Sequence, residues 1–487
     1  MSLQTVPTNG FSFFSKKPVV VETTELRLTS DAGLLPFREL DQQLGFTAGF
    51  AQALRDSRRA ASVTHATLEM VRSRVFGILA GYSDQNDHDT LRFDAVFQLI
   101  ADRVPGDALA SQPTLSRFEN AITPGDLFRL RTELVDQFIA SFPEPPSRLL
   151  FDLDAFDDQA HGEQQLRLFH GFYGQYQYLP LVITSADTDL VVAICLRHGT
   201  AKASLGAGED LRYLVRRLRA VWPDVVIEIR ADSGFGVPEM YEDCEELGLI
   251  YSLGYQMNSV IKERTADLLE QAISQHAAAV KALEDRSELV THENTKQRLF
   301  TGFWYRAGTW SRARWVVVKV EAHLKGTNRR AIVTNRPGAP ILPQGAYDEY
   351  VQRGESENRN KELKVSLEAD RLSDHRVLAN AFRLQLHVLA YNLLVRMRQL
   401  VADPPEVAGE LERQALPEAE RRRYANARRR CDPLGEGHAE TWRTRVIKVA
   451  AEIVIRARHI RIRLSQTWPH LNHYQSVCQA VLAAAPS

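Results

Sequence analysis

The order of predicted secondary-structure elements between residues 148 and 253 constrains the fold more than any other feature of this chain. Apolar periodicity predicts three strands followed by alternating helices and strands. The strands are at 148–154, 177–184, 189–196, 225–231 and 249–253, and the helices are at 207–221 and 237–247. Such an order is typical of a mixed sheet covered by helices. We therefore expect an α/β fold in this part of the chain.

The flanking segments have a different character. Residues 39–142 carry apolar residues three and four apart, which predicts helices, and the run 142–146 contains prolines that end them. Residues 254–344 interrupt the α/β alternation with a charged helix at 261–289 and three further strands. A polar helix follows from about residue 346 past 364, then an apolar helix at 375–400 and a strand-like tail at 446–464.

This pattern predicts four parts in the chain. They are a mostly helical N-terminal domain at 1–142, an α/β core at 147–253 and 345–400, a β-rich insertion at 254–344 and a basic C-terminal region at 401–487. Hydrophobic residues make up 44% and charged residues 25% of the 487 residues, which indicates globular domains rather than a disordered chain. The four cysteines lie far apart, and no segment resembles a signal peptide or spans a bilayer, so we expect a cytoplasmic protein.

Acidic residues end two of the predicted strands. Strand alternation places Asp152 and Asp154 on one face of the strand at 148–154, and Asp232 ends the strand at 225–231, before Gly234 and Gly236. A buried carboxylate needs a partner or a bound cation, so these acids are candidates for chemistry. The alternative is that each aspartate caps a helix.

A helical stripe provides the third acidic residue. Tyr350, Arg353, Glu357 and Lys364 have offsets of 0, 3, 7 and 14, which place them on one helix face. A stripe of this kind can hold a cation through the carboxylate while the basic groups reach phosphates. Charged runs more often form a solvated helix face, and that alternative stays open.

This spacing resembles the Tyr-Arg-Glu-Lys signature of DDE transposases from bacterial insertion sequences. The similarity covers most of the chain, including the segments LTSDAGLLPFREL, SQPTLSRFENA, FHGFYGQYQYLPL and RADSGF. It is similar to a subgroup whose first acid lies in an LDLDATDD-like strand, although Phe156 stands where that pattern has threonine.

The resemblance implies a ribonuclease H-like mixed sheet with helices on its flanks. It implies that Asp154, Asp232 and Glu357 are catalytic and bind two Mg²⁺ ions, for which Mn²⁺ can substitute, with Asp152 as the alternative first acid. The implied reaction is cleavage of insertion-sequence ends and joining of their 3′ hydroxyl ends to target DNA by cut-and-paste transposition. Tyr350, Arg353 and Lys364 would then position the DNA end.

The implied partners are double-stranded DNA, as terminal inverted repeats and as target, and a second copy of the chain in the synaptic complex. Residues 421–465 contain 13 Lys or Arg against 4 Asp or Glu, which favours a polyanion, although a solvated basic surface is equally compatible. The candidate phosphate contacts there are Arg421, Arg422, Arg423, Arg428, Arg429 and Arg430. In the N-terminal domain, Arg117 lies early in a predicted helix that either contacts DNA or packs in the bundle.

Two alternatives to a transposase remain from sequence alone. One is a transposase-derived protein that binds DNA without cutting it, which the altered position Phe156 allows. The other is a glycoside hydrolase with paired carboxylates, which the basic tail does not suit. Tyr173, Tyr176 and Tyr178 are interpreted as core residues rather than as platforms for DNA bases.

Overall fold

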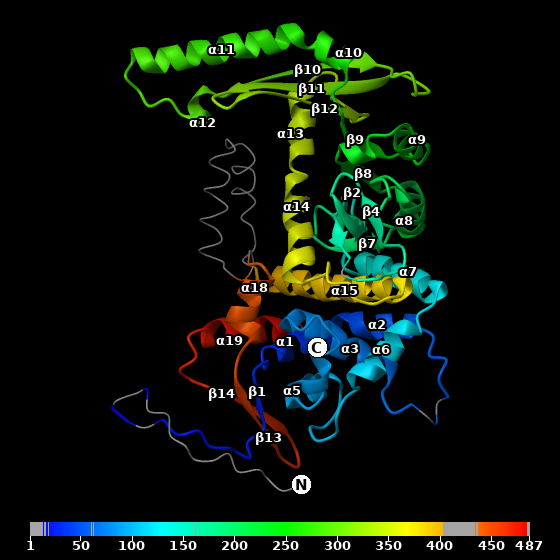
Figure 1. Ribbon diagram of the computed structural model, residues 1–487, viewed down its shortest axis with the longest axis vertical. Coiled ribbons are helices and arrows are strands. Elements are labelled where there is room, and N and C mark those ends of the chain that lie inside the picture. Colours follow the sequence, from blue (N-terminus) through cyan, green and yellow to red (C-terminus); the bar gives the residue numbers. More distant parts are fainter. Residues whose placement is uncertain are drawn as a thin grey trace.

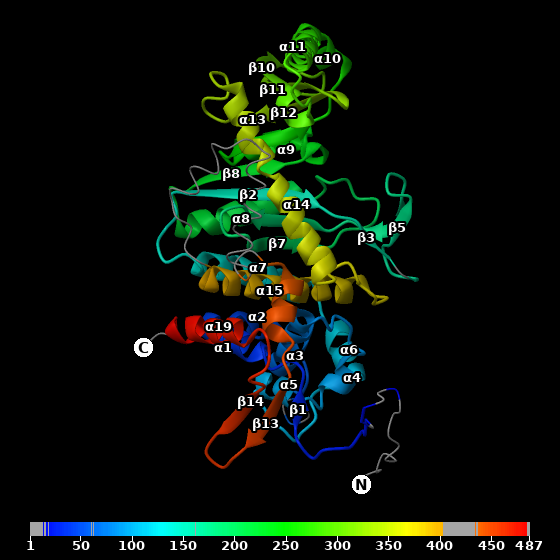
Figure 2. The ribbon, with the colours of Figure 1, turned by 90° about the vertical axis from the view of Figure 1, so that its left-hand side faces the viewer.

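The computed structural model describes residues 19–402 and 437–484 apart from 60, 62 and 161, together with residues 13, 16, 17 and 434. Figures 1 and 2 show a mixed sheet in the upper part of the molecule and a layer of helices beneath it. The described part contains no helix with the length and apolar character that crossing a membrane requires.

The central sheet has eight strands in the order β10-β11-β12-β9-β8-β2-β6-β7. Its strands are β2 (Arg148–Ala155), β6 (Leu181–Ser185), β7 (Val191–Cys195), β8 (Val226–Ala231), β9 (Ile250–Tyr255), β10 (Gln297–Tyr305), β11 (Arg314–His323) and β12 (Gly326–Thr334). Strands β2, β8 and β9 run parallel, and the other pairs are antiparallel. The predicted mixed α/β sheet is confirmed.

One predicted strand is wrong. Residues 177–184 form the end of β5 (Gln175–Tyr178) and most of β6, separated by Leu179 and Pro180. Proline lacks an N–H for the ladder, so the chain leaves one sheet and enters another at this point. Strand β5 pairs instead with β3 (Asp158–Gln159) and β4 (Leu168–His170) in a small second sheet.

Helices cover the central sheet. Helix α8 (Ala207–Val221) leads from β7 to β8, and α9 (Pro238–Glu246) connects the parallel strands β8 and β9. The long helix α11 (Ala266–Asp285) lies over β10 and β11 beside the short α10 (Ser259–Arg264) and α12 (His292–Thr295). Strand β12 pairs with β9, so the three strands from the predicted insertion extend the central sheet. On the side of the sheet away from α8 and α9, α13 (Pro343–Val351) and α14 (Gly354–Lys361) run down past the sheet toward α15 (Val377–Val401) (Figure 1).

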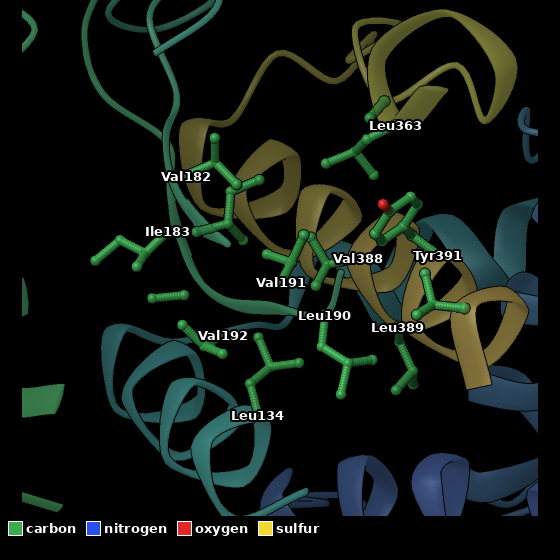
Figure 3. Packing of buried hydrophobic residues seen from close by; sticks show 14 of the residues in the cluster. Leu134, Val182, Ile183, Leu190, Val191, Val192, Leu363, Val388, Leu389 and Tyr391 are labelled. Atoms are coloured by element: carbon green, nitrogen blue, oxygen red, sulfur yellow. The ribbon is translucent and has the colours of Figure 1, made fainter. Parts of the chain in front are cut away.

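Helix α15 (Val377–Val401) joins the sheet to the helical layer. It is buried on nearly all sides, as expected of a helix that is apolar around its circumference. Figure 3 shows Val388 and Leu389 of α15 packed near Leu190 and Val191 at the start of β7, with Leu134 of α7 (Pro124–Ala140) close by. Each such side chain contributes about 1.5–3 kcal/mol when fully buried.

The helical layer contains most of the N-terminal residues. Its helices are α1 (Leu34–Leu44), α2 (Phe46–Ala53), α3 (Thr67–Ala80), α4 (His88–Leu91), α5 (Ala95–Ile100), α6 (Gln112–Asn120) and α7 (Pro124–Ala140). The predicted helical character of residues 39–142 is confirmed by these elements.

The C-terminal residues return to this layer. The chain forms α18 (Ala439–Trp442), the π-helical turn η4 (Arg443–Ile447), the hairpin β13 (Ala451–Ile455) and β14 (Ile460–Leu464), and α19 (Leu471–Ala483). Strand β13 also pairs with the short N-terminal strand β1 (Leu28–Thr29). The strand-like pattern predicted at 446–464 is therefore a turn followed by a hairpin, because the charged residues at its centre form the hairpin tip.

A buried ion triad connects three helices of this layer. The Glu119 carboxylate on α6 has no exposure and accepts hydrogen bonds from Arg74 Nε at 2.8 Å and Arg383 Nε at 2.5 Å. Replacing Glu119 with glutamine leaves the buried Arg74 guanidinium without a counter-charge among the described residues, while Arg383 still lies 3.3 Å from Asp374 Oδ2. We therefore expect a loss of about 3–5 kcal/mol of stability. Urea unfolding measures this loss.

The control for this prediction lies two residues earlier on the same helix. Arg117 is exposed, and its substitution by glutamine should change stability by less than about 0.5 kcal/mol. Equal unfolding midpoints for the two variants would contradict a supporting role for the triad.

Candidate active site

The two strands that carry acidic residues end side by side. Strands β2 and β8 are parallel neighbours, and their register pairs Leu153 with Ala231. The next residues along the two strands are Asp154 and Asp232. Because parallel strands end at the same edge of a sheet, this register brings the two aspartates together. The juxtaposition joins positions that are far apart in the sequence.

Asp154 lies in a mostly buried environment. Its Oδ1 accepts from the backbone N–H of Ala155 at 2.9 Å, and its Oδ2 accepts from Asn360 Nδ2 at 2.8 Å and from Arg353 Nη1 at 3.4 Å. Burial raises the pKa of Asp154 to about 6, Arg353 opposes that rise, and the nearby carboxylates of Asp232 and Glu357 add to it. The charges of the other two predicted acids therefore act on Asp154.

Asp232 occupies a tight turn at the end of β8. Its Oδ1 accepts from the backbone N–H of Gly234 at 2.8 Å and caps the 3₁₀ turn η2 (Ser233–Phe235). Asp232 therefore caps this turn, which is the alternative that the sequence left open. The cap uses only one of its carboxylate oxygens, and the carboxylate still lies beside Asp154. Gly254 of β9 packs against this turn so closely that a Cβ there would lie 2.6 Å from the Ser233 nitrogen. A glycine is required because the backbone of β9 supports the Asp232 turn directly.

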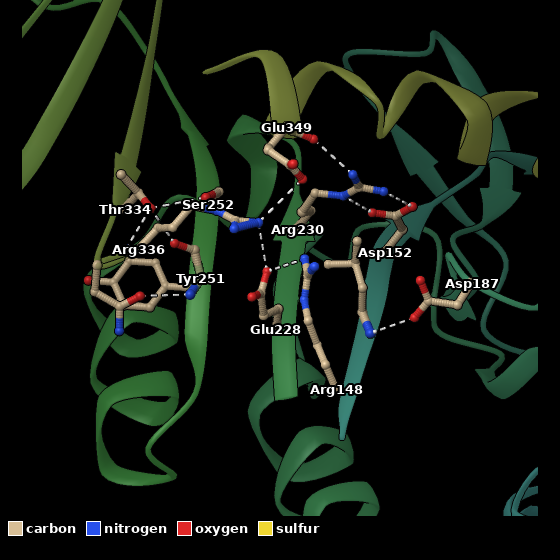
Figure 4. A network of polar contacts seen from close by, with 12 residues as sticks. Arg148, Asp152, Asp187, Glu228, Arg230, Tyr251, Ser252, Thr334, Arg336 and Glu349 are labelled. Carbon is tan, nitrogen blue, oxygen red and sulfur yellow. Dashed lines mark hydrogen bonds and ion pairs between the residues drawn. The ribbon is translucent and has the colours of Figure 1, made fainter. Parts of the chain in front are cut away.

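Asp152 has a different environment from Asp154, although both lie on the same strand face. Arg230 of β8 is its cross-strand partner and donates from Nε to Oδ1 at 2.7 Å and from Nη2 to Oδ2 at 2.9 Å (Figure 4). Arg359 Nη1 lies 3.6 Å from the same Oδ2. Both oxygens of Asp152 are thus engaged by guanidinium groups, which leaves Asp154 as the acid of β2 that faces Asp232.

The predicted helical stripe is not one regular helix. Helix α13 ends at Val351, α14 begins at Gly354, and the π-helical turn η3 (Glu362–Ser366) replaces the last α-helical turn. The predicted continuous helix from 346 past 364 is therefore wrong in detail. The π-helical turn changes the angle per residue, so the position of Lys364 is not the one that regular 100° spacing gives.

The basic members of the stripe contact the acids of β2 and the residues that follow them. Arg353 reaches Asp154 and lies 3.8 Å from Glu357 Oε1, while Tyr350 hydrogen-bonds to Arg353. Lys364 Nζ lies 2.8 Å from Asp157 Oδ1. These basic members of the stripe therefore face the end of β2.

Glu357 is the outermost of the three acids. Its side chain is 71% exposed, and Arg353 stands between it and Asp154. Within the described ranges, no group of three or more His, Cys, Asp or Glu side chains is arranged to hold a metal ion. The cationic group next to Asp154 in this structure is thus the Arg353 guanidinium.

Two functional candidates were not identified from the sequence. Asn360 donates to Asp154, and its spacing of seven residues from Arg353 could have placed it on the same helix face. Asp157 binds Lys364, and Lys364 is the main cause that lowers the pKa of Asp157 against the effect of its burial. Phe156, the departure from the transposase pattern, is a core residue with 7% exposure.

A cavity of about 700 Å³ opens beside Asp232. Its walls include Phe172 and Tyr173 from the β4–β5 segment, Lys202, and Tyr255 of β9. A cavity of this size accommodates a nucleotide-sized group, and its aromatic and basic walls suit a base and a phosphate.

The aromatic residues of this segment differ from their predicted core positions. Tyr178 is fully buried, as predicted, but Tyr173 is 40% and Tyr176 51% exposed. The interpretation as core is wrong for these two residues, because the small sheet β3-β5-β4 projects from the rest of the described structure (Figure 2).

The remaining predicted DNA contacts lie away from the acids or outside the described residues. Arg117 is exposed on α6 and donates to Thr114 Oγ1 at 3.2 Å, while the buried face of the helix packs on α15 through Phe118 and Phe382. The arginines at 421–423 and 428–430 fall outside the described residues.

A family model described as "Transposase DDE domain group 1" matches residues 11–411. This span includes β2, β8 and α14 with all three candidate acids. No curated protein matches the sequence.

Proposed function

This chain belongs to the DDE transposase family, and we propose that it cleaves the ends of an insertion sequence and joins the freed 3′ hydroxyl ends to target DNA by a cut-and-paste reaction. We further propose that its mixed sheet is a ribonuclease H-like core. Asp154, Asp232 and Glu357 are the catalytic acids in this proposal.

The register of β2 against β8 carries the proposal. It sets Asp154 beside Asp232 at one sheet edge, and α14 brings Glu357 within electrostatic range of Asp154. Gathering like charges in a buried environment is unfavourable unless a cation or a charged substrate compensates them. Strong perturbation of a carboxylate beside a cavity is typical of functional sites.

The donor set fits divalent cations. The three candidate ligands offer oxygen atoms, which Mg²⁺ prefers, and a cation would relieve the repulsion that these carboxylates impose on one another. Asp154, Asp232 and Glu357 would hold two Mg²⁺ ions, and Mn²⁺ could replace them. The bound ions would supply charge stabilisation to the phosphate and lower the pKa of the attacking oxygen nucleophile.

The other side chains position the DNA. Arg353 and Asn360 hold the Asp154 carboxylate in a fixed orientation through Oδ2, and Tyr350 orients Arg353. The guanidinium of Arg353 has further donors that suit a phosphate oxygen. Lys364, held by Asp157, offers a second phosphate contact. The cavity beside Asp232 has room for the nucleotide next to the cleaved bond.

The domain assignment is part of the same proposal. Residues 1–142 recognise the DNA end, with Arg117 as a contact, and residues 147–253 and 345–400 form the catalytic core. Residues 254–344 are an insertion in that core, and residues 401–487 provide basic contacts to DNA. Two copies of the chain pair in the synaptic complex. The protein acts in the cytoplasm of a bacterium.

Metal removal tests the proposal directly. Purified protein is incubated with a duplex that carries the terminal inverted repeat found next to its gene. We expect strand cleavage with Mg²⁺ or Mn²⁺, no cleavage with excess EDTA, and none by the Asp232→Asn variant with either metal. Gel analysis of end-labelled strands measures the products. Cleavage in EDTA, or undiminished cleavage by Asp232→Asn, would refute the assignment.

A transposase-derived protein that binds DNA without cutting it is the second candidate. The observation that favours it is the position of Arg353, which contacts Asp154 where a cation would be needed. Wild-type protein that binds the repeat but leaves it uncut in both metals would support this alternative.

A further inference from the structure

The β13–β14 hairpin is a basic surface that the site described above does not use. Its strands pair in antiparallel register from Ala451 opposite Leu464 to Ile455 opposite Ile460. The tip is a tight turn in which the backbone N–H of Arg456 donates to the His459 carbonyl at 2.9 Å. The hairpin projects at the end of the molecule opposite α11, with the helical layer between it and the central sheet (Figure 1).

The base of the hairpin is fixed to the fold. Ala451 and Ile453 are 4% and 3% exposed, and Ile462 and Leu464 pack against the same core. The backbone N–H of Ile453 donates to the Arg27 carbonyl at 2.8 Å beside the β1–β13 pairing. The tip is thus held by a rigid base.

The tip and the outer face of the hairpin are strongly basic. Four arginines and one histidine in this region are exposed: Arg456, Arg458, His459, Arg461 and Arg463. The hairpin contains one acid, Glu452, whose Oε2 lies 3.1 Å from Arg463 Nη1. Within the described ranges no carboxylate forms an ion pair with Arg456, Arg458 or Arg461, so their charges are not neutralised by the protein that the structure describes.

These arginines surround a shallow hollow. A depression of about 410 Å³ is lined by Arg456, Arg458, His459 and Arg461 together with Ala457. Arg461 Nε donates to His459 Nε2 at 2.8 Å, which fixes the orientation of one guanidinium at its edge. Guanidinium groups facing a common hollow suit an anion with several oxygen atoms, such as the phosphates of a polymer.

We propose that the β13–β14 hairpin binds the sugar–phosphate backbone of double-stranded DNA at a place separate from the cleaved end. The inference rests on the proposed function, which assigns basic DNA contacts to residues 401–487, and it narrows them to this hairpin. A two-stranded ribbon fits the major groove of a duplex, and arginines at its tip and outer face would contact phosphates on both sides. The hairpin contacts then add affinity that depends on salt and little on base sequence.

The test uses the full-length protein and a triple variant, Arg456→Gln, Arg458→Gln and Arg461→Gln. Fluorescence anisotropy gives the Kd for a labelled duplex at several salt concentrations. Loss of about three phosphate contacts should weaken binding on the order of 10²-fold near physiological salt and make the slope of log K against log salt shallower by about 2 to 3. A thermal melt checks that the variant remains folded.

A matched control variant removes the same number of positive charges from another part of the surface. Lys281, Arg286 and Lys325 are exposed near the opposite end of the molecule, on or after α11 and between β11 and β12. Their triple replacement by glutamine should leave Kd and the salt slope close to those of the wild type. Equal weakening by both triple variants would show a general charge effect and overturn the proposal.

Two further outcomes separate this inference from the proposed function. If the wild type binds and cleaves its DNA but the hairpin variant binds with unchanged Kd and slope, the hairpin proposal alone is overturned. A hairpin variant that loses binding to anionic phosphatidylserine vesicles, while its DNA affinity is unchanged, would assign the surface to lipid and likewise overturn it. If the wild type binds no DNA, the proposed function and this inference fail together.

Discussion

Replacing Glu357 with glutamine should lower the rate of strand cleavage by about 10³-fold or more while leaving the fold intact. The side chain is 71% exposed, so the substitution removes the charge that we propose binds metal without disturbing the core. A neutral amide cannot neutralise a divalent cation, and the charge stabilisation of the transition state is lost with it. Single-turnover cleavage of an end-labelled repeat measures the rate.

Glu355 provides the matched control on the same helix. It lies two residues before Glu357, is exposed and carries the same charge. The Glu355→Gln variant should cleave at a rate close to that of the wild type, and both variants should have the wild-type melting temperature. Comparable rates for Glu357→Gln and the wild type would remove Glu357 from the catalytic set.

Replacing Asp154 with asparagine should stabilise the metal-free protein at neutral pH even though it abolishes cleavage. Burial raises the pKa of Asp154 from its ordinary value of 3.8 to about 6, so the folded state holds a proton that the unfolded state has released between these pH values. Stability therefore falls as pH rises through this window, by about 3 kcal/mol in all. Asparagine resembles the protonated acid and avoids this loss.

Denaturant unfolding in EDTA at pH 4 and pH 8 measures this effect. We expect the variant and the wild type to have similar stability at pH 4 and the variant to be more stable at pH 8. If the free energy of unfolding of the variant differed from that of the wild type by the same amount at both pH values, the prediction would be contradicted. Saturating Mg²⁺ should reduce the difference at pH 8, because a ligand that binds the folded state stabilises it.

Replacing Asp152 with asparagine should change the stability of the protein in the opposite direction. This residue lies two residues earlier on the same strand face, but its oxygens accept two hydrogen bonds from Arg230. Asp152→Asn leaves a buried guanidinium without its counter-charge and should destabilise the protein by about 3–5 kcal/mol. The contrast between the two variants separates a carboxylate held for structure from one held for chemistry.

Local patterns predicted most of the secondary structure. The strand at 148–154 and the helix at 207–221 are observed at 148–155 and 207–221, because apolar periodicity reports on which face of an element is buried. The same reasoning failed at Pro180, where one apolar run serves two sheets, and at 362–366, where the helix becomes π-helical. Neither change alters the local hydrophobic pattern enough to be detected.

The candidate site was predicted in part. Helical spacing identified Arg353 and Glu357, whose mutual contact and shared effect on Asp154 are seen in the structure, while their catalytic role stays a prediction. Asn360 was not predicted, because the prediction of the site rested on charged side chains and an amide carries no charge. The exposure of Tyr173 and Tyr176 was missed because alternation cannot tell a covered sheet from a projecting one.

The sequence by itself determined the family, the mixed α/β character of the sheet and the spacing of the Tyr-Arg-Glu-Lys stripe, since these depend on residue types and on distances along the chain. The tertiary structure alone decided which of the two acids on one face of β2 lies beside Asp232 and which is paired with Arg230. Arg230, 78 residues away, neutralises Asp152 through strand pairing. An ion pair between neighbouring strands depends on their register, and the packing of the whole sheet sets that register.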